Sequence, residues 1–71
     1  MSGAKYWEMI SDKLAREGFS VGHVGFTDAQ GREMWSADAS RDGKRWIVHA
    51  ENLSAAFLEL ETQTREAVAV D

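Results

Sequence analysis

The chain has 71 residues, no cysteine, no proline and a formal net charge of −4 at pH 7. Its length predicts a single domain over residues 1–71, because so short a chain holds at most one hydrophobic core. An apolar content of 44% with three tryptophans excludes intrinsic disorder. The lack of cysteine excludes disulfide scaffolds and thiol chemistry.

Residues 5–17 are predicted to form an amphipathic helix. Its apolar stripe repeats at helical spacing and consists of Trp7, Ile10 and Leu14. Gly18 occupies the position at which a helix commonly ends in the left-handed conformation, and Phe19 then follows where it can contact Leu14. The helix is therefore expected to end in a Schellman motif.

Beyond this helix the apolar pattern changes to a period of two, which predicts strands over residues 19–27, 32–40 and 44–50. Two turns separate these strands. Residues 28–31 read Asp-Ala-Gln-Gly and residues 42–43 read Asp-Gly, both typical of hairpins. Such short connections join antiparallel neighbours, so the three strands are expected to form a meander.

The second hairpin has one register that suits its side chains. A two-residue turn at Asp42-Gly43 pairs Arg41 with Lys44. It also places Trp35 and Trp46 on one face, each opposite an alanine. A slip by one residue would separate the two tryptophans. The tryptophan face is therefore predicted to be the core, and the opposite face of the sheet to be open.

The first strand is ambiguous. Val21 and Phe26 have opposite parity, so a regular strand cannot bury both, and Gly22 and Gly25 suggest a bulge between them. The first turn has either four loop residues or three residues and a glycine bulge. This choice decides which face of the sheet His23 occupies.

The last element is predicted to be a helix over residues 53–67. Asn52 and Ser54 are both suitable N-caps, and Ser54 has the better hydrophobic staple. The apolar stripe of this helix consists of Leu53, Phe57, Leu60, Thr64 and Ala67. Residues 68–71 are expected to fray or to contact a partner.

The predicted fold is α+β, an α-β-β-β-α two-layer sandwich in which both helices pack on the tryptophan face of a three-stranded antiparallel meander. Double-stranded RNA-binding domains have the same element order and a similar length. Those domains grip phosphates with a basic cluster at the start of the last helix. Residues 51–56 contain no lysine or arginine, so we do not assign the chain to that family.

The open sheet face is the predicted partner-binding surface. It carries Met34, Ser36, Asp38, Arg45, Ile47 and His49, joined by Val21 or by Val24 and Phe26 according to the register. Strand 44–50 is expected to be an exposed edge with strong β-propensity, of a kind that proteins protect or use. A chain of this length also gains from additional burial. We therefore expect a non-catalytic protein-interaction module that forms a homodimer through the open face or through the edge of strand 44–50.

A nucleic-acid-binding module is the first alternative. Arg41, Lys44 and Arg45 gather at the second turn and would form its contact surface. Three cations are a small footprint, because useful affinity usually requires about six or more phosphate contacts. A protein partner is therefore favoured over a nucleic acid.

A metal site is the second alternative. With a four-residue first turn, His23, Ser36 and His49 would form a row across the open face, with Asp38 on the diagonal. Two imidazoles and a distant carboxylate are an incomplete ligand set for zinc. Ser36 would also lie in mid-strand without oxyanion donors or a pocket. We therefore expect neither a cofactor nor enzymatic activity.

The expected location is the cytoplasm. No apolar stretch approaches the roughly 20 residues of a membrane-spanning helix. Charged residues are spread through residues 5–17, where a signal peptide would have its apolar core. The sequence therefore predicts no contact with a membrane.

Overall fold

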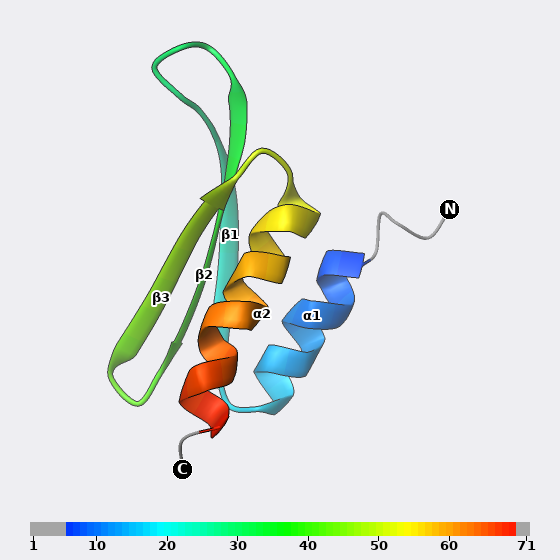
Figure 1. The fold of residues 1–71 in the computed structure, drawn as a ribbon, viewed down its shortest axis with the longest axis vertical. Coiled ribbons are helices and arrows are strands. Elements are labelled where there is room, and N and C mark those ends of the chain that lie inside the picture. The colour runs from blue at the N-terminus through cyan, green and yellow to red at the C-terminus, as the bar shows by residue number, and fades with distance from the viewer. Residues whose placement is uncertain (1–5, 70–71) are drawn as a thin grey trace.

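The computed structural model describes the backbone of residues 6–69 and side chains as far as Arg65. Its elements are α1 (Tyr6–Arg16), β1 (Ser20–Thr27), β2 (Glu33–Arg41), β3 (Lys44–Ala50) and α2 (Leu53–Ala69). The strands form one antiparallel sheet in the order β1-β2-β3. Both helices lie on the same side of this sheet (Figure 1). The predicted α-β-β-β-α fold is confirmed, and the elements begin and end close to their predicted positions.

The end of α1 has the predicted Schellman geometry. Gly18 has a φ of 95°, which is the left-handed conformation that glycine adopts at low cost. The Phe19 amide donates to the Leu14 carbonyl at 3.0 Å, and the Gly18 amide donates to the Ala15 carbonyl at 3.1 Å. Leu14 and Phe19 are both buried in the core. The turn therefore satisfies two helix carbonyls and directs the chain from α1 into β1.

A side chain from the sheet completes this helix end. Arg41 of β2 donates from Nη1 to the Glu17 carbonyl at 2.9 Å. Its guanidinium also lies over the Phe19 ring, 4.3 Å from the ring centroid, where a cation is attracted by the π-system. Arg41 therefore ties α1 to the middle strand through one hydrogen bond and one cation–π contact.

The second hairpin has the predicted register. Asp42 and Gly43 have φ values of 55° and 82°, as a type I′ turn requires. Trp46 pairs with Ala39, and Trp35 pairs with Ala50. Both indoles pack against the core cluster beneath the helices. The prediction that both tryptophans lie on the inner face is confirmed.

The first turn has three loop residues and a glycine bulge, so this alternative is correct and the four-residue turn is wrong. The Asp28 amide donates to the Arg32 carbonyl at 3.0 Å, and the Gly31 amide donates to the Asp28 carbonyl at 3.0 Å. Gly31 has a φ of 84°. This arrangement is a type I turn followed by a left-handed glycine.

The predicted bulge within β1 is wrong. Pairing with β2 runs without interruption from Ser20 opposite Ser40 to Thr27 opposite Glu33. A regular strand cannot bury both Val21 and Phe26, and it does not: Val21 faces the helices and Phe26 faces the open side. Gly25 serves a different purpose from a bulge, since the Trp35 indole lies directly over it. A Cβ at Gly25 would come within 3.2 Å of that ring.

The Asp28 carboxylate holds the first turn. It accepts hydrogen bonds from the Gln30 and Arg32 amides, each at 2.9 Å, and pairs with Arg32 Nε at 3.0 Å. These bonds, that of the Arg32 amide first, hold the pKa of Asp28 below its ordinary value of 3.8. A carboxyl group whose pKa is lower in the folded state adds stability above its unfolded pKa and loses it as the pH falls through the folded pKa.

We therefore expect Asp28→Asn, which keeps an acceptor oxygen but removes the charge, to be less stable than the wild type at pH 7. The difference should shrink as the pH falls below 3.8, because the wild-type carboxylate then becomes protonated. Urea unfolding of both proteins between pH 7 and pH 2 measures this. A difference that stays constant across that range would contradict the role of the charge.

The first turn of α2 begins at Asn52, whose Oδ1 accepts the Ala55 amide at 2.8 Å. Of the two predicted N-caps, Asn52 is therefore correct, and Ser54, which has the better staple, is not the cap. The predicted stripe faces the sheet, since Phe57, Leu60 and Thr64 are buried. The predicted stripe residue Ala67 lies beyond the described side chains. The helix continues to Ala69, and residues 70–71 of the segment expected to fray lie outside the described residues.

Candidate interaction surface on the open sheet face

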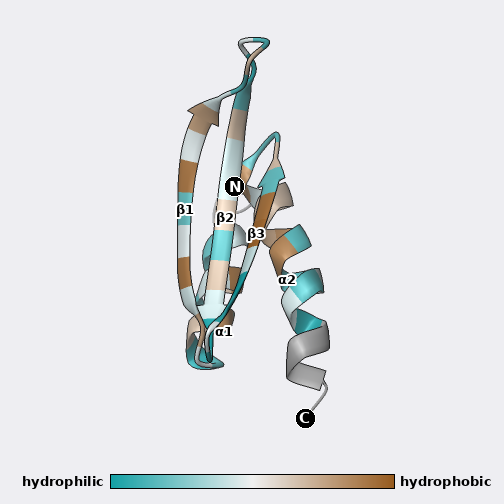
Figure 2. Cartoon of the chain, turned by 90° about the vertical axis from the view of Figure 1, so that its left-hand side faces the viewer, coloured by the Kyte–Doolittle hydropathy of each residue, from teal (hydrophilic) through white to brown (hydrophobic). Residues whose placement is uncertain are grey.

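All six predicted partner-binding residues lie on the sheet face opposite the helices. In the observed register Ser36 pairs with His49, Asp38 pairs with Ile47, and Arg45 pairs with Ser40. Met34 has the same parity along β2 and pairs with Phe26. Figure 2 looks onto this face, with the three strands in front of both helices. We call this surface the open face.

Three large apolar side chains on the open face are exposed. Val24 is 59% exposed, Ile47 is 50% exposed and Phe26 is 39% exposed. The Phe26 ring meets the His49 imidazole edge-on, with centroids 5.5 Å apart, and β1 and β3 both carry hydrophobic bands in Figure 2. We call Val24, Phe26, Ile47 and His49 the apolar patch.

The sequence alone did not assign Val24 and Phe26 to a face of the sheet, because that assignment depends on the register of β1 with β2, which the sequence left open. The signal that would have placed them is Gly31, because a left-handed glycine at the end of a three-residue loop sets the pairing of β1 with β2.

The charged side chains of the open face lie nearer the second turn and balance each other. Arg45 Nη2 lies 3.6 Å from Asp38 Oδ2. Gly22 lies beside this pair, and a Cβ there would come within 3.1 Å of Asp38 Oδ1. The glycine therefore leaves room for the carboxylate to lie across β1. Among its described residues, the open face carries one acid and one base, so it presents no net repulsion to a second copy of itself.

His23 lies on the inner face, so the predicted row with Ser36 and His49 is wrong. The observed register pairs His23 with Ala37. His23 is exposed, and its imidazole packs against three aromatic rings, with centroid distances of 4.9 Å to Trp7, 6.0 Å to Phe57 and 6.2 Å to Trp35. The two histidines thus lie on opposite sides of the sheet. Within residues 6–69, no group of three potential metal-ligating side chains is found.

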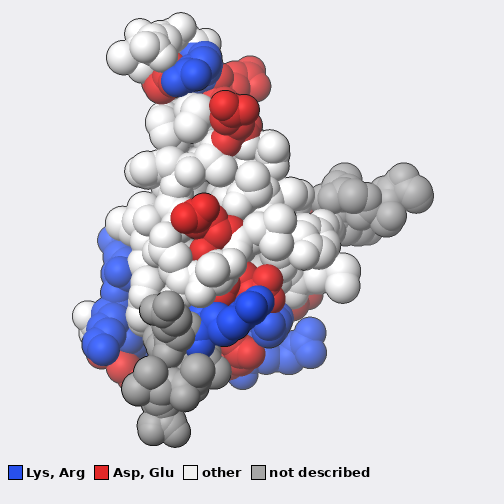
Figure 3. Space-filling model, in the orientation of Figure 1, with Lys and Arg blue, Asp and Glu red and all other residues white. Residues whose placement is uncertain are grey.

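The three cations proposed for nucleic-acid contact do not share a surface. Arg41 points to the inner face and contacts the end of α1. Arg45 points to the open face and pairs with Asp38. Lys44 pairs with Arg41 across the turn and therefore lies on the side of the sheet opposite Arg45. Basic atoms gather where this turn lies at the lower end of Figure 3, but they belong to two faces of the hairpin.

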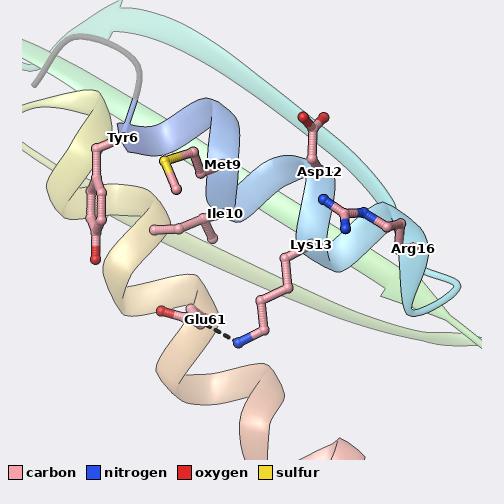
Figure 4. A pocket seen from close by; sticks show the side chains of 7 residues that line it. All are labelled: Tyr6, Met9, Ile10, Asp12, Lys13, Arg16 and Glu61. Atoms are coloured by element: carbon pink, nitrogen blue, oxygen red, sulfur yellow. Dashed lines mark hydrogen bonds and ion pairs between the residues drawn. The ribbon is translucent and has the colours of Figure 1, made fainter. Parts of the chain in front are cut away.

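A groove of about 380 Å³ lies between the two helices on the other side of the molecule. Figure 4 shows its lining, with Tyr6, Met9 and Ile10 at the apolar end. At the polar end Lys13 Nζ lies 2.8 Å from Glu61 Oε2. The hydrogen bond to Glu61 raises the pKa of Lys13. These two charges neutralise each other and link α1 to α2.

No helix in the described part of the chain is long and apolar enough to cross a membrane. Comparisons of the chain with protein-family models, with curated proteins and with solved structures gave no match.

Proposed function

We propose that this chain is a non-catalytic protein-interaction module that associates with a second copy of itself through the open face. The observation that carries the proposal is the apolar patch. Val24, Phe26 and Ile47 are large side chains that stand exposed together on one face of a sheet. Exposed apolar patches of this kind mark interaction sites in soluble proteins.

The occupant we assign to the open face is another open face. Asp38 and Arg45 balance each other, so two such faces meet without a net charge penalty. The rest of the chain is acidic overall, with a net charge of −4, and would repel an identical copy at short range. A neutral apolar face is therefore the surface through which copies meet at least cost. Packing two sheets face to face would bury the patch in a layer about 10 Å thick.

We expect Ile47→Glu to weaken self-association about tenfold or more, because it places a charge in a contact that would exclude water. Leu58→Glu is the matched control, since Leu58 is 44% exposed and lies on α2. Sedimentation equilibrium at several concentrations measures the average mass against the 7.9 kDa chain. A wild type that remains at 7.9 kDa at high micromolar concentration, or equal effects of the two substitutions, would refute the proposal.

A further inference from the structure

The free edge of β1 lacks the devices by which proteins usually protect an edge strand. Charged side chains, proline and bulges all discourage another strand from pairing. The β1 sequence Ser-Val-Gly-His-Val-Gly-Phe-Thr contains no lysine, arginine, aspartate, glutamate or proline. Its pairing with β2 is regular over its whole length. The edge of β3, by contrast, begins with Lys44 and Arg45.

The backbone groups on this edge can be identified from the turn. The Asp28 amide bonds to Arg32 across the hairpin. Bonding pairs alternate along an antiparallel ladder. Residues 20, 22, 24 and 26 therefore bond to β2. The amides and carbonyls of Val21, His23, Gly25 and Thr27 point away from the sheet. In Figure 2 no other helix or strand lies on the outer side of β1, away from β2. These groups make no hydrogen bond to a side chain within the described part of the chain.

We infer that β1 pairs with β1 of a second copy in an antiparallel, twofold arrangement centred on Val24. The inference rests on the proposed function, because it explains how the open face becomes large enough to hold a partner. Three strands of seven to nine residues present a flat area of roughly 350 Å². Two such faces fall short of the roughly 1,200 Å² that stable interfaces bury.

Pairing at β1 enlarges the open face without disturbing it. The outward-pointing residues all have odd numbers, so they pair odd with odd across the twofold axis. Val21 and His23 face the helices in each copy, so the helices of both copies lie on one side and both open faces lie on the other. The product is a six-stranded sheet with a continuous open face. Two of these sheets, stacked through their open faces, make an assembly of four chains.

The register centred on Val24 is favoured by the side chains. It places Phe26 opposite Gly22 of the second copy, and His23 opposite its Gly25. Each ring then faces a residue without a side chain, so large and small groups alternate across the join. A register centred on His23 would instead place two imidazoles directly opposite each other.

The position of α1 agrees with the same register. Trp7, near the start of α1, contacts His23, and the helix ends beside Phe19. Figure 1 shows that the part of β1 leading to the first turn extends past α1. With the axis at Val24, each copy of α1 lies on its own side of the axis. The two helices therefore do not compete for the same space.

A single introduced cysteine tests this pairing. The chain contains no cysteine, so a thiol at position 24 is unique. In the inferred register two copies of Val24→Cys form a non-hydrogen-bonded pair with Cα atoms about 4.5 Å apart, within the range that a disulfide spans. Disulfides can also join two sheets that pack face to face, as they do in immunoglobulin domains, so a second cysteine variant on the same face is needed to separate the two modes of contact.

We expect Val24→Cys, in oxidised glutathione, to give a band at twice the 7.9 kDa chain mass on a non-reducing gel. The rate of disulfide formation by Val24→Cys should exceed that of Ile47→Cys about tenfold or more. Position 47 is similarly exposed on the same face, but two copies of it would lie roughly 24 Å apart across the axis. Equal rates for the two variants would overturn the inferred register.

A second variant tests the backbone bonds directly. Thr27→Pro removes an outward-pointing amide while leaving the bonds to β2 intact, and proline is tolerated at such edge positions. We expect it to weaken association about tenfold or more, since two intermolecular bonds are lost. Thr27→Ala, which keeps the amide, should associate as the wild type does. Identical association of both variants would overturn edge pairing. The open-face contact is tested separately by Ile47→Glu, so a failure of one proposal can be distinguished from a failure of the other.

Discussion

Phe57→Ala is expected to lower the free energy of unfolding by about 3–5 kcal/mol, which is the usual effect of removing a buried aromatic ring. Phe57 is fully buried on α2. Its ring stacks on Trp7 at 5.6 Å and meets His23 at 6.0 Å. Truncation would therefore leave a cavity where α1, α2 and β1 converge. A domain of this size has a total stability of roughly 4–10 kcal/mol, so a large share of it would be lost.

Urea denaturation followed by circular dichroism measures this change. Protein concentration must be held fixed, because self-association would add to the apparent stability. Leu58→Ala is the control, because the neighbouring side chain points to solvent on the same helix and its loss should change stability by less than about 1 kcal/mol. A similar cost for both substitutions would contradict the observed placement of the helix.

Leu14→Ala is expected to cost about 2–5 kcal/mol, because Leu14 is almost completely buried. It occupies the last turn of α1, where its carbonyl accepts the Phe19 amide. The Leu14 and Phe19 side chains belong to the same core cluster. The substitution would therefore remove both core volume and the apolar contact that accompanies the Schellman turn.

The matched control for this substitution is Met9→Ala on the same helix, because Met9 is mostly exposed. Thermal unfolding of the two variants at equal concentration gives the comparison. For a domain of this length, each kcal/mol corresponds to a shift in Tm of about 4–8 °C. If Met9→Ala lowered the Tm as much as Leu14→Ala, α1 would be packed through a different face from the one observed.

The second hairpin could be predicted in detail because its side chains and its turn require the same register. The Asp42-Gly43 turn fixes the loop length, and both residues adopt the positive φ values of a type I′ turn. The same register puts Trp35 and Trp46 on the inner face. Two independent features therefore agreed on one answer, and a slip by one residue would have violated both.

The first strand could not be predicted to the same depth, because its two possible registers differ only in loop length. The Asp28 side chain closes the turn by binding two amides ahead of it, and no periodicity in the strand reveals such a local contact. The position of His23 depended on this choice, and so did the membership of Val24 and Phe26 in the apolar patch. The six other open-face residues all lie on the two strands of the second hairpin, and they were correctly placed because the register of that hairpin was predicted correctly. They are Met34, Ser36, Asp38, Arg45, Ile47 and His49.

The role of Arg41 shows a limit of reading charge from sequence. Its position beside Lys44 and Arg45 indicated a basic cluster. In the folded chain its guanidinium is committed to Glu17 and Phe19, which are distant in sequence. A residue near a turn was thus recruited by an element that only tertiary packing brings close, and no local pattern predicts such a contact.

This same arginine joins two parts of the molecule into one cooperative unit. The carbonyl of Glu17, directly after α1, gains its side-chain donor only after the middle strand has come into place beneath it. The strand in turn is aligned by the tight turn at Asp42-Gly43. Fraying of the helix terminus therefore requires loss of a contact anchored in the sheet. The end of the short N-terminal helix is thus coupled to the hairpin, and its local unfolding costs more free energy than that of an isolated helix end.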